Sequence, residues 1–159
     1  MKDIKFVSKI QLCQMDELSE TDKRLVDKAI EATKNSYAPY SNFHVGACLR
    51  LADGREVIGA NQENAAFPSG LCAERSAIFA AQSTYPESAI VALAIAAQNE
   101  NGLTSQPVSP CGACRQVILE MEDRYKQDVR ILLYGTEGVY VIPSVKSIMP
   151  LHFVDSSMK

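Results

Sequence analysis

A continuous apolar stretch, Ile90–Ala97, constrains the fold of this chain more than any other segment. It has the length of a β-strand and shows no alternation of apolar and polar residues. Strands of this kind lie inside a sheet whose two faces are both covered, usually by helices. We therefore expect Ile90–Ala97 at the centre of a sheet with a helical layer on each side.

The rest of the chain alternates between strand and helix patterns. Strands are predicted at Phe43–Leu51, Arg55–Gly59, Val129–Tyr134 and Val139–Ile142, the first two joined by the hairpin signal Asp53-Gly54. Helices are predicted at Thr21–Ser36, with Ser19 or Thr21 as N-cap, at Cys72–Gln82 and at Cys111–Glu122. Asn99–Ser109 is expected to be a loop. The pattern predicts an α/β fold, a three-layer α/β/α arrangement around five strands.

Length, composition and charge limit the possible functions. The 159 residues, 47% hydrophobic and 22% charged, suit one catalytic domain over residues 1–159, with residues 1–18 expected to be a loosely ordered N-terminal extension. The net charge of -3 and the short Lys/Arg runs argue against a polynucleotide partner and favour a small substrate. No apolar run reaches membrane-spanning length and the N-terminus lacks a signal-like segment, so a cytoplasmic location is expected.

Three of the five cysteines form a pattern typical of a metal site. Cys111 and Cys114 are separated by about one helical turn, and Cys72 begins another predicted helix. Helix N-termini favour the thiolate form. Three protein ligands leave a fourth position for water, which indicates a catalytic rather than a structural zinc. Cys13 and Cys48 lie outside this pattern and are expected to be an N-terminal residue and a small buried side chain.

Charged residues next to the cysteines suggest further parts of the site. Glu74 lies on the same helical turn as Cys72, so its carboxylate can act as a general acid and base on metal-bound water. The alternative is a first-turn Glu stabilised by the helix dipole. Three thiolates and Zn²⁺ sum to a negative charge, which Arg75 and Arg115 can offset by donating hydrogen bonds to sulfur. Ordinary surface ion pairs are the alternative for both arginines.

With these residues in view, the chain resembles the small, three-cysteine, homotetrameric cytidine deaminases. Zinc deaminases carry His-x-Glu or a Cys variant, followed by Pro-Cys-x-x-Cys. This chain reads Cys72-Ala73-Glu74 and then Pro110-Cys111-Gly112-Ala113-Cys114. The resemblance runs from about Tyr37 to Phe153 and is carried by Tyr37–Phe43, Asn61–Phe67, Cys72–Arg75 and Pro110–Val117. It implies a mixed sheet, one zinc per subunit, a homotetramer, and hydrolytic deamination of cytidine and 2'-deoxycytidine in pyrimidine salvage.

The resemblance also implies roles for individual residues. Asn61 and Glu63 correspond to residues that hydrogen-bond the ribose hydroxyls, Phe43 to one that stacks on the pyrimidine, and Ala73 to one that contacts substrate. Phe153 corresponds to a residue that completes the site of a neighbouring subunit. Without the resemblance, Phe43 is read as core, Asn61 as a turn residue and Glu63 as a solvated charge.

The chain departs from the family pattern at two positions, and two other functions compete with cytidine deamination. Phe67 stands where a Tyr is common in the family, and Gln62 stands where an Ile is common. The two histidines, His44 and His152, are not expected to bind the metal. A blasticidin S-type deaminase shares both halves of the zinc motif, but Asn61–Asn64 favours a ribose. A noncatalytic zinc module that binds RNA or protein is disfavoured by the acidic charge and by Glu74.

Overall fold

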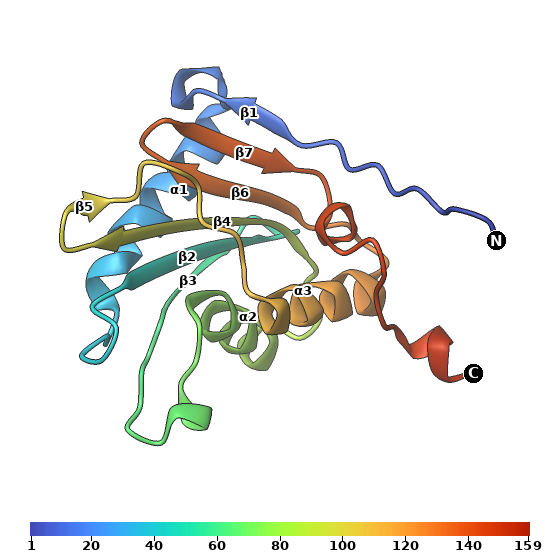
Figure 1. Ribbon diagram of the computed structural model, residues 1–159. Helices are drawn as coiled ribbons and strands as arrows, with labels where there is room; N and C mark the ends of the chain where they lie inside the picture. Colours follow the sequence, from blue (N-terminus) through green and yellow to red (C-terminus); the bar gives the residue numbers. More distant parts are fainter.

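Strand β4 (Ile90–Asn99) lies inside the sheet between β2 and β6, as its apolar sequence predicts. The computed structural model describes residues 1–159 (Figure 1). The strand order is β1-β7-β6-β4-β2-β3, with β5 paired to β4. The other strands are β1 (Gln11–Cys13), β2 (His44–Leu51), β3 (Glu56–Ala60), β5 (Gly102–Leu103), β6 (Arg130–Gly135) and β7 (Gly138–Ile142).

The sheet is mixed because only β4 and β6 run parallel. The other neighbouring strands pair antiparallel, beginning with the β2–β3 hairpin that Asp53-Gly54 predicted. A parallel pair needs a long crossover. Helix α3 (Gly112–Tyr125) lies in the crossover that connects β4 to β6.

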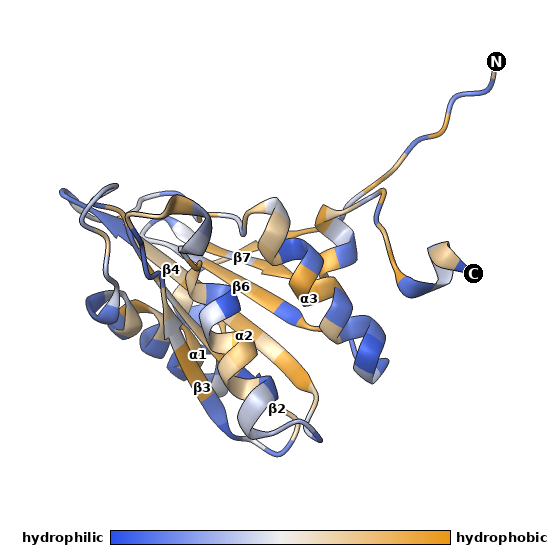
Figure 2. Ribbon diagram, turned by 90° about the horizontal axis from the view of Figure 1, so that it is seen from below, coloured by the Kyte–Doolittle hydropathy of each residue, from blue (hydrophilic) through white to orange (hydrophobic).

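Helices cover both faces of the sheet, as the three-layer prediction requires (Figure 1). Helix α1 (Glu20–Ala32) packs on one face, and α2 (Ala73–Thr84) packs with α3 on the other. Side chains alternate across a strand. In β2, Cys48 therefore joins the core under α1 and Leu49 joins the core under α2 and α3. Figure 2 shows that the central strands of the sheet are largely apolar along their length.

A glycine fixes the position at which α2 begins. A Cβ on Gly59 of β3 would lie 2.4 Å from the carbonyl oxygen of Ala73, closer than any real contact. Only a glycine lets the backbones approach this closely. This contact places the first turn of α2, and with it Cys72 and Glu74, against the sheet.

The prediction of five strands is wrong, because the sheet has seven. The additional strands are β1, which extends the edge at β7, and β5, which turns back from β4 through Gly102 at φ 101°. With three and two residues, they are too short for an alternating pattern to reveal them. β5 lies in the segment expected to be a loop, and β1 in the segment expected to be loosely ordered.

Other local expectations can be compared directly. Ser19 is the N-cap of α1, and its hydroxyl accepts a hydrogen bond from the N–H of Asp22 at 3.2 Å, as predicted. No helix of the structure combines the length and the apolar character that a membrane crossing requires.

Candidate metal and active site

Helices α2 and α3 begin beside one another and bring three cysteines together. Cys72 is the N-cap residue of α2, Cys111 is the N-cap residue of α3, and Cys114 lies in the first turn of α3. Their sulfur atoms lie within 4.8 Å of one another, with Cys72 Sγ 3.8 Å from Cys111 Sγ and Cys111 Sγ 3.4 Å from Cys114 Sγ. Cys13 and Cys48 are not part of this cluster.

The three sulfurs fit one zinc ion. Zinc binds thiolate sulfur at about 2.3 Å in tetrahedral geometry, so two sulfurs on one ion lie about 3.8 Å apart. The two separations that involve Cys111 are near this value, and the third is within 4.8 Å. No His, Asp or Glu joins the three cysteines as a fourth ligand in the cluster. The donor set is therefore that of a site with an open coordination position.

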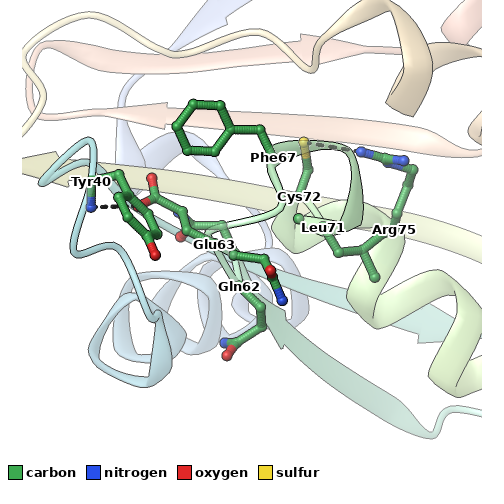
Figure 3. A pocket seen from close by; sticks show the side chains of 10 residues that line it. Tyr40, Gln62, Glu63, Phe67, Leu71, Cys72 and Arg75 are labelled. Atoms are coloured by element: carbon green, nitrogen blue, oxygen red, sulfur yellow. Dashed lines mark hydrogen bonds between the residues drawn. The ribbon is translucent and has the colours of Figure 1, made fainter.

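Hydrogen bonds among the three cysteines shift the pKa values of two of them. A hydrogen bond with the side chain of Cys114, followed by one from Arg75, lowers the pKa of Cys72 to about 5. Nη2 of Arg75 lies 3.6 Å from Cys72 Sγ (Figure 3). The same hydrogen bond to Cys72, together with burial, raises the pKa of Cys114. These contacts favour the thiolate form of Cys72, and a bound metal would displace the protons that remain on the other thiols.

Glu74 lies in the first turn of α2, with only 4% of its surface exposed. Burial raises the pKa of its carboxyl group, and the negative charge of Cys72 adds to the effect. A carboxyl group with a raised pKa holds a proton more readily near neutral pH, as a general acid and base requires.

A cavity of about 300 Å³ opens onto these residues. The residues predicted for the site that line it are Phe43, Asn61, Glu63, Cys72, Ala73, Glu74 and Cys111. Five further residues line it that the sequence did not indicate: Ser41, Val45, Ile95, Val108 and Ser109. The position of Val108 and Ser109 directly before Pro110-Cys111 was the available signal, whereas Ile95 could not be distinguished from its neighbours in the apolar run.

Backbone hydrogen bonds hold Asn61–Glu63 between two other segments. Tyr37 donates to the carbonyl of Asn61 at 2.9 Å and accepts from Glu63 at 2.8 Å. On the other side, Gln62 and Leu71 exchange two hydrogen bonds of 2.9 Å. Because Leu71 directly precedes Cys72, the segment predicted to bind ribose is fixed relative to the metal ligands.

The side chains of Asn61 and Glu63 also contact the segment that contains Phe43. The amide of Asn61 donates to the carbonyl of Phe43 at 3.0 Å and accepts from the N–H of Val45 at 2.8 Å. The carboxylate of Glu63 accepts from the N–H groups of Tyr40 and Ser41 at 2.8 and 3.2 Å and from the Ser41 hydroxyl. The Ser41 hydroxyl is the main cause of the lowered pKa of Glu63, which keeps this side chain an anionic acceptor.

A second cavity of about 390 Å³ adjoins the first and shares Asn61, Glu63 and Cys72 with it (Figure 3). Tyr40 and Phe67 line its outer part, with their rings edge to face and 5.7 Å between centroids. Phe67 is 75% exposed, so the position at which the chain departs from the common Tyr lies on the outer surface of this chain.

Arg115 does not lie where the sequence analysis placed it. Its Nε donates to the carbonyl of Pro110 at 2.9 Å and its Nη1 to the carbonyl of Ile148 at 2.8 Å, rather than to a cysteine sulfur. The prediction of a hydrogen bond from Arg115 to a thiolate is therefore wrong, because backbone carbonyls occupy the guanidinium. Arg115 instead fixes the residue that precedes Cys111.

Phe153 and the two histidines do not line the cavity. Phe153 is 56% exposed, and its carbonyl accepts from Nε2 of Gln116 at 2.9 Å. Nδ1 of His44 lies 2.5 Å from the hydroxyl of Ser36, and Nδ1 of His152 lies 2.9 Å from the carbonyl of Met149. The sulfur cluster includes neither histidine. A role of Phe153 in a neighbouring subunit stays a prediction.

Comparison with known proteins identifies the family. Residues 19–127 match the family described as "Cytidine and deoxycytidylate deaminase zinc-binding region". The chain belongs to this family. Among its members, a cytidine deaminase from Halalkalibacterium halodurans is 39% identical over 134 residues, which are 84% of this chain and 95% of the relative.

Solved structures of cytidine deaminases share the fold. The enzyme from Burkholderia pseudomallei has a TM-score of 0.70 and 35% identity, over 82% of this chain and 97% of that chain. The enzyme from Mycobacterium tuberculosis has a TM-score of 0.64 and 31% identity, over 82% and 95% respectively. The resemblance inferred from the zinc motifs is thus confirmed for the cytidine and deoxycytidylate deaminase family.

Proposed function

We propose that this chain is a zinc-dependent cytidine deaminase, which hydrolyses cytidine and 2'-deoxycytidine to uridine and 2'-deoxyuridine and releases ammonia. One observation carries the proposal: buried Glu74 shares a cavity with the thiolate cluster and with the residues that suit a nucleoside. The names of the relatives, cytidine deaminases that match over most of the chain, support the same reaction.

Cys72, Cys111 and Cys114 hold one zinc ion per subunit in this proposal. The spacing of their sulfur atoms supports it, and so does the lowered pKa of Cys72. When bound, zinc supplies a Lewis acid that lowers the pKa of a water molecule and keeps it in the cavity. Arg75 offsets part of the negative charge through its hydrogen bond to Cys72.

Glu74 moves the protons of the reaction. Its carboxylate accepts a proton from the water that forms a bond to C4 of the pyrimidine, and passes this proton to ring N3. It then transfers a second proton from the added hydroxyl to the amino group, so that the C4–N bond breaks and ammonia leaves. The burial that raises the pKa of Glu74 supports this role, because each step needs a carboxyl group that gains and loses a proton readily.

Phe43, Asn61, Glu63 and Ala73 bind the nucleoside. Phe43 stacks on the pyrimidine, Ala73 contacts it, and Asn61 and Glu63 bind the ribose hydroxyls. Their common position along one cavity supports this assignment. The lowered pKa of Glu63 adds to it, since an ionised carboxylate accepts hydrogen bonds from hydroxyl groups.

The proposal extends to the assembly and the setting. Residues 1–159 act as one catalytic domain in a cytoplasmic homotetramer, and the reaction serves pyrimidine salvage. Phe153 completes the site of a neighbouring subunit, and its exposure supports this because a buried side chain could not reach a partner. Arg115 supports the site by fixing Pro110.

A substrate panel tests the proposed function. Purified protein is assayed for zinc and for the absorbance change on incubation with cytidine, 2'-deoxycytidine and blasticidin S. We expect turnover of the two nucleosides and none of blasticidin S. Turnover of blasticidin S alone would show a different deaminase, and a zinc-loaded protein that converts none of the three would indicate a noncatalytic zinc module.

A further inference from the structure

The hydroxyl of Ser41 forms two hydrogen bonds of opposite direction. It donates to Oε1 of Glu63, and it accepts from the N–H of Phe43 at 3.1 Å. A serine hydroxyl has one donor and two acceptor sites, so both bonds can exist together. One oxygen atom thus connects the carboxylate of Glu63, assigned to the ribose, with the backbone of Phe43, whose ring is assigned to the pyrimidine.

One carboxylate oxygen of Glu63 can accept a further hydrogen bond from a ligand. Oε2 accepts from the backbone N–H groups of Tyr40 and Ser41 at 2.8 and 3.2 Å. Oε1 accepts only from the Ser41 hydroxyl. Since a carboxylate oxygen accepts about two hydrogen bonds, Oε1 keeps one site for a hydroxyl of the substrate.

Both backbone polar groups of Phe43 form hydrogen bonds with side chains. Its N–H donates to Ser41 and its carbonyl accepts from the side chain of Asn61 at 3.0 Å. Between Ser41 and Phe43, Asn42 has φ 52°, a left-handed conformation that Asn tolerates better than most residues. The hydrogen bond from Phe43 to Ser41 spans this residue and therefore sets the direction in which Phe43 leaves the turn.

We propose that Ser41 is a positioning residue for nucleoside recognition, which couples the carboxylate of Glu63 to the backbone of Phe43. The proposal rests on the proposed function for the identity of the ligand. Its consequence is that loss of the Ser41 hydroxyl weakens binding mainly through the ribose, because Oε1 of Glu63 loses its hydrogen bond while the carbonyl of Phe43 stays bonded to Asn61 and the metal ligands stay in place.

The test compares Ser41→Ala with Ser41→Thr, which keeps the hydroxyl. Ser83→Ala is the matched control, because Ser83 is exposed and bonds only the carbonyl of Ala80. For each zinc-loaded protein, calorimetry gives the Kd of uridine and of 2',3'-dideoxyuridine, and kinetics give kcat and KM for cytidine. Ser41→Ala is expected to weaken uridine binding and raise KM about ten-fold, with kcat within about two-fold of the wild type.

The ribose hydroxyls provide the decisive comparison. Binding of 2',3'-dideoxyuridine should change less than about three-fold in Ser41→Ala, and Ser41→Thr and Ser83→Ala should resemble the wild type. Unchanged uridine binding in Ser41→Ala overturns the proposal, as does an equal loss for both ligands. A chain that binds uridine through Ser41 but does not convert cytidine supports the role of Ser41 and refutes the proposed function. A wild-type protein that does not bind uridine refutes both.

Discussion

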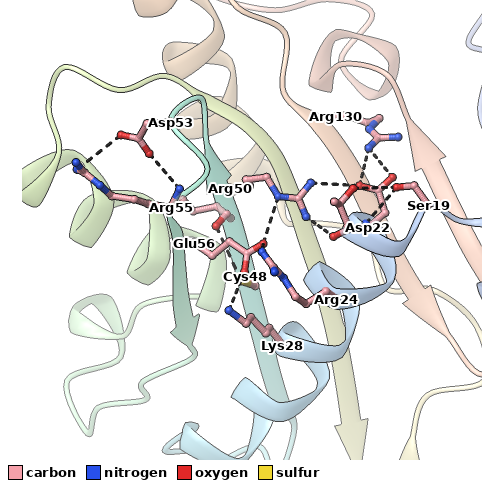
Figure 4. A network of polar contacts seen from close by, with 12 residues as sticks. Ser19, Asp22, Arg24, Lys28, Cys48, Arg50, Asp53, Arg55, Glu56 and Arg130 are labelled. Carbon is pink, nitrogen blue, oxygen red and sulfur yellow. Dashed lines mark hydrogen bonds and ion pairs between the residues drawn. The ribbon is translucent and has the colours of Figure 1, made fainter.

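Two regions of this molecule contain carboxylates with little exposed side-chain surface and surround them differently. In the α1 ion-pair network, Asp22 and Glu56 have side chains 2% and 4% exposed, and Arg24, Lys28, Arg50 and Arg130 contact them (Figure 4). In the metal and active site, Glu74 is 4% exposed as a whole residue, and the charged groups that act on its carboxyl group are Cys72 and Arg75. The first region joins α1 to the sheet, and the second opens onto a cavity.

The pKa values of the two regions move in opposite directions. Burial opposes ionisation of Glu56, but hydrogen bonds from Lys28, Arg24 and Arg50 still hold the pKa of Glu56 below its usual range. Burial raises the pKa of Glu74. Burial alone therefore does not determine the state of a carboxyl group, and its partners do. Charges in the network stabilise the fold, whereas the carboxyl group at the site remains available for proton transfer.

The largest expected effect is on catalysis. Glu74→Gln removes the group that transfers protons but keeps the shape of the side chain, so kcat for cytidine should fall by about 10²- to 10⁴-fold. Zinc content and the melting temperature should stay at or above wild-type values, because a neutral amide is easier to bury. The control is Glu56→Gln, which should keep kcat. Normal turnover in Glu74→Gln would remove this residue from the mechanism.

The next effect is on stability. Asp22→Ala removes the buried partner of Arg130 and one of the two carboxylate partners of Arg50, and the free energy of unfolding should fall by about 2–3 kcal/mol. Urea unfolding measures this change, with Asp27→Ala on the exposed face of α1 as the control. The kcat of the folded fraction should not change. A stable Asp22→Ala protein with reduced kcat would show that the two regions are not independent.

A smaller effect is expected on the pH dependence of the free energy of unfolding. Because the pKa of Glu56 is lowered from 4.5 in the fold, Glu56 stabilises the protein above pH 4.5, and this contribution is lost as the pH falls through the folded pKa. At pH 7, Glu56→Gln should lower the free energy of unfolding by about 1–3 kcal/mol. Below pH 4.5 the difference from the wild type should shrink. If the difference in the free energy of unfolding between Glu56→Gln and the wild type stays constant between pH 7 and pH 3, ionised Glu56 does not stabilise the fold.

The smallest effect is expected at Gln62, whose side chain is exposed and donates to the carbonyl of Asn35 at 3.1 Å. Gln62→Ile restores the residue common in the family and removes this bond and a longer one, of 3.5 Å, to the carbonyl of Ala60. The free energy of unfolding should change by less than about 0.5 kcal/mol, and KM for cytidine by less than about two-fold. Ser69→Ala, in the same exposed loop, is a suitable control for effects of any substitution there. A larger change in KM would show that Gln62 contributes to substrate binding.

The sequence predicted the parts of the molecule that depend on residues close to one another in the chain. The run Ile90–Ala97 indicated the internal strand, and the paired motifs at Cys72 and Cys111 indicated the sulfur cluster and the family. Strands β1 and β5 could not be predicted, since their two or three residues take their conformation from the strands beside them.

Long-range contacts limited the prediction of the site. Arg115 follows Cys114 in sequence, but its direction depends on the carbonyl of Ile148, which only the folded chain brings near. The contact between Ser41 and Glu63 likewise joins two segments that no sequence spacing relates. Local patterns thus identified the reactive groups, while the residues that orient them required the structure.

The central claim is that Cys72, Cys111 and Cys114 hold one zinc ion that the reaction needs. The most direct measurement follows zinc per chain and cytidine turnover in the same samples, for the wild type and for Cys111→Ser, before and after chelation and return of zinc. We predict about one zinc per wild-type chain, turnover that falls and recovers with zinc content, and loss of both in Cys111→Ser. Full turnover in a zinc-free chain, or unchanged zinc in Cys111→Ser, would contradict the account.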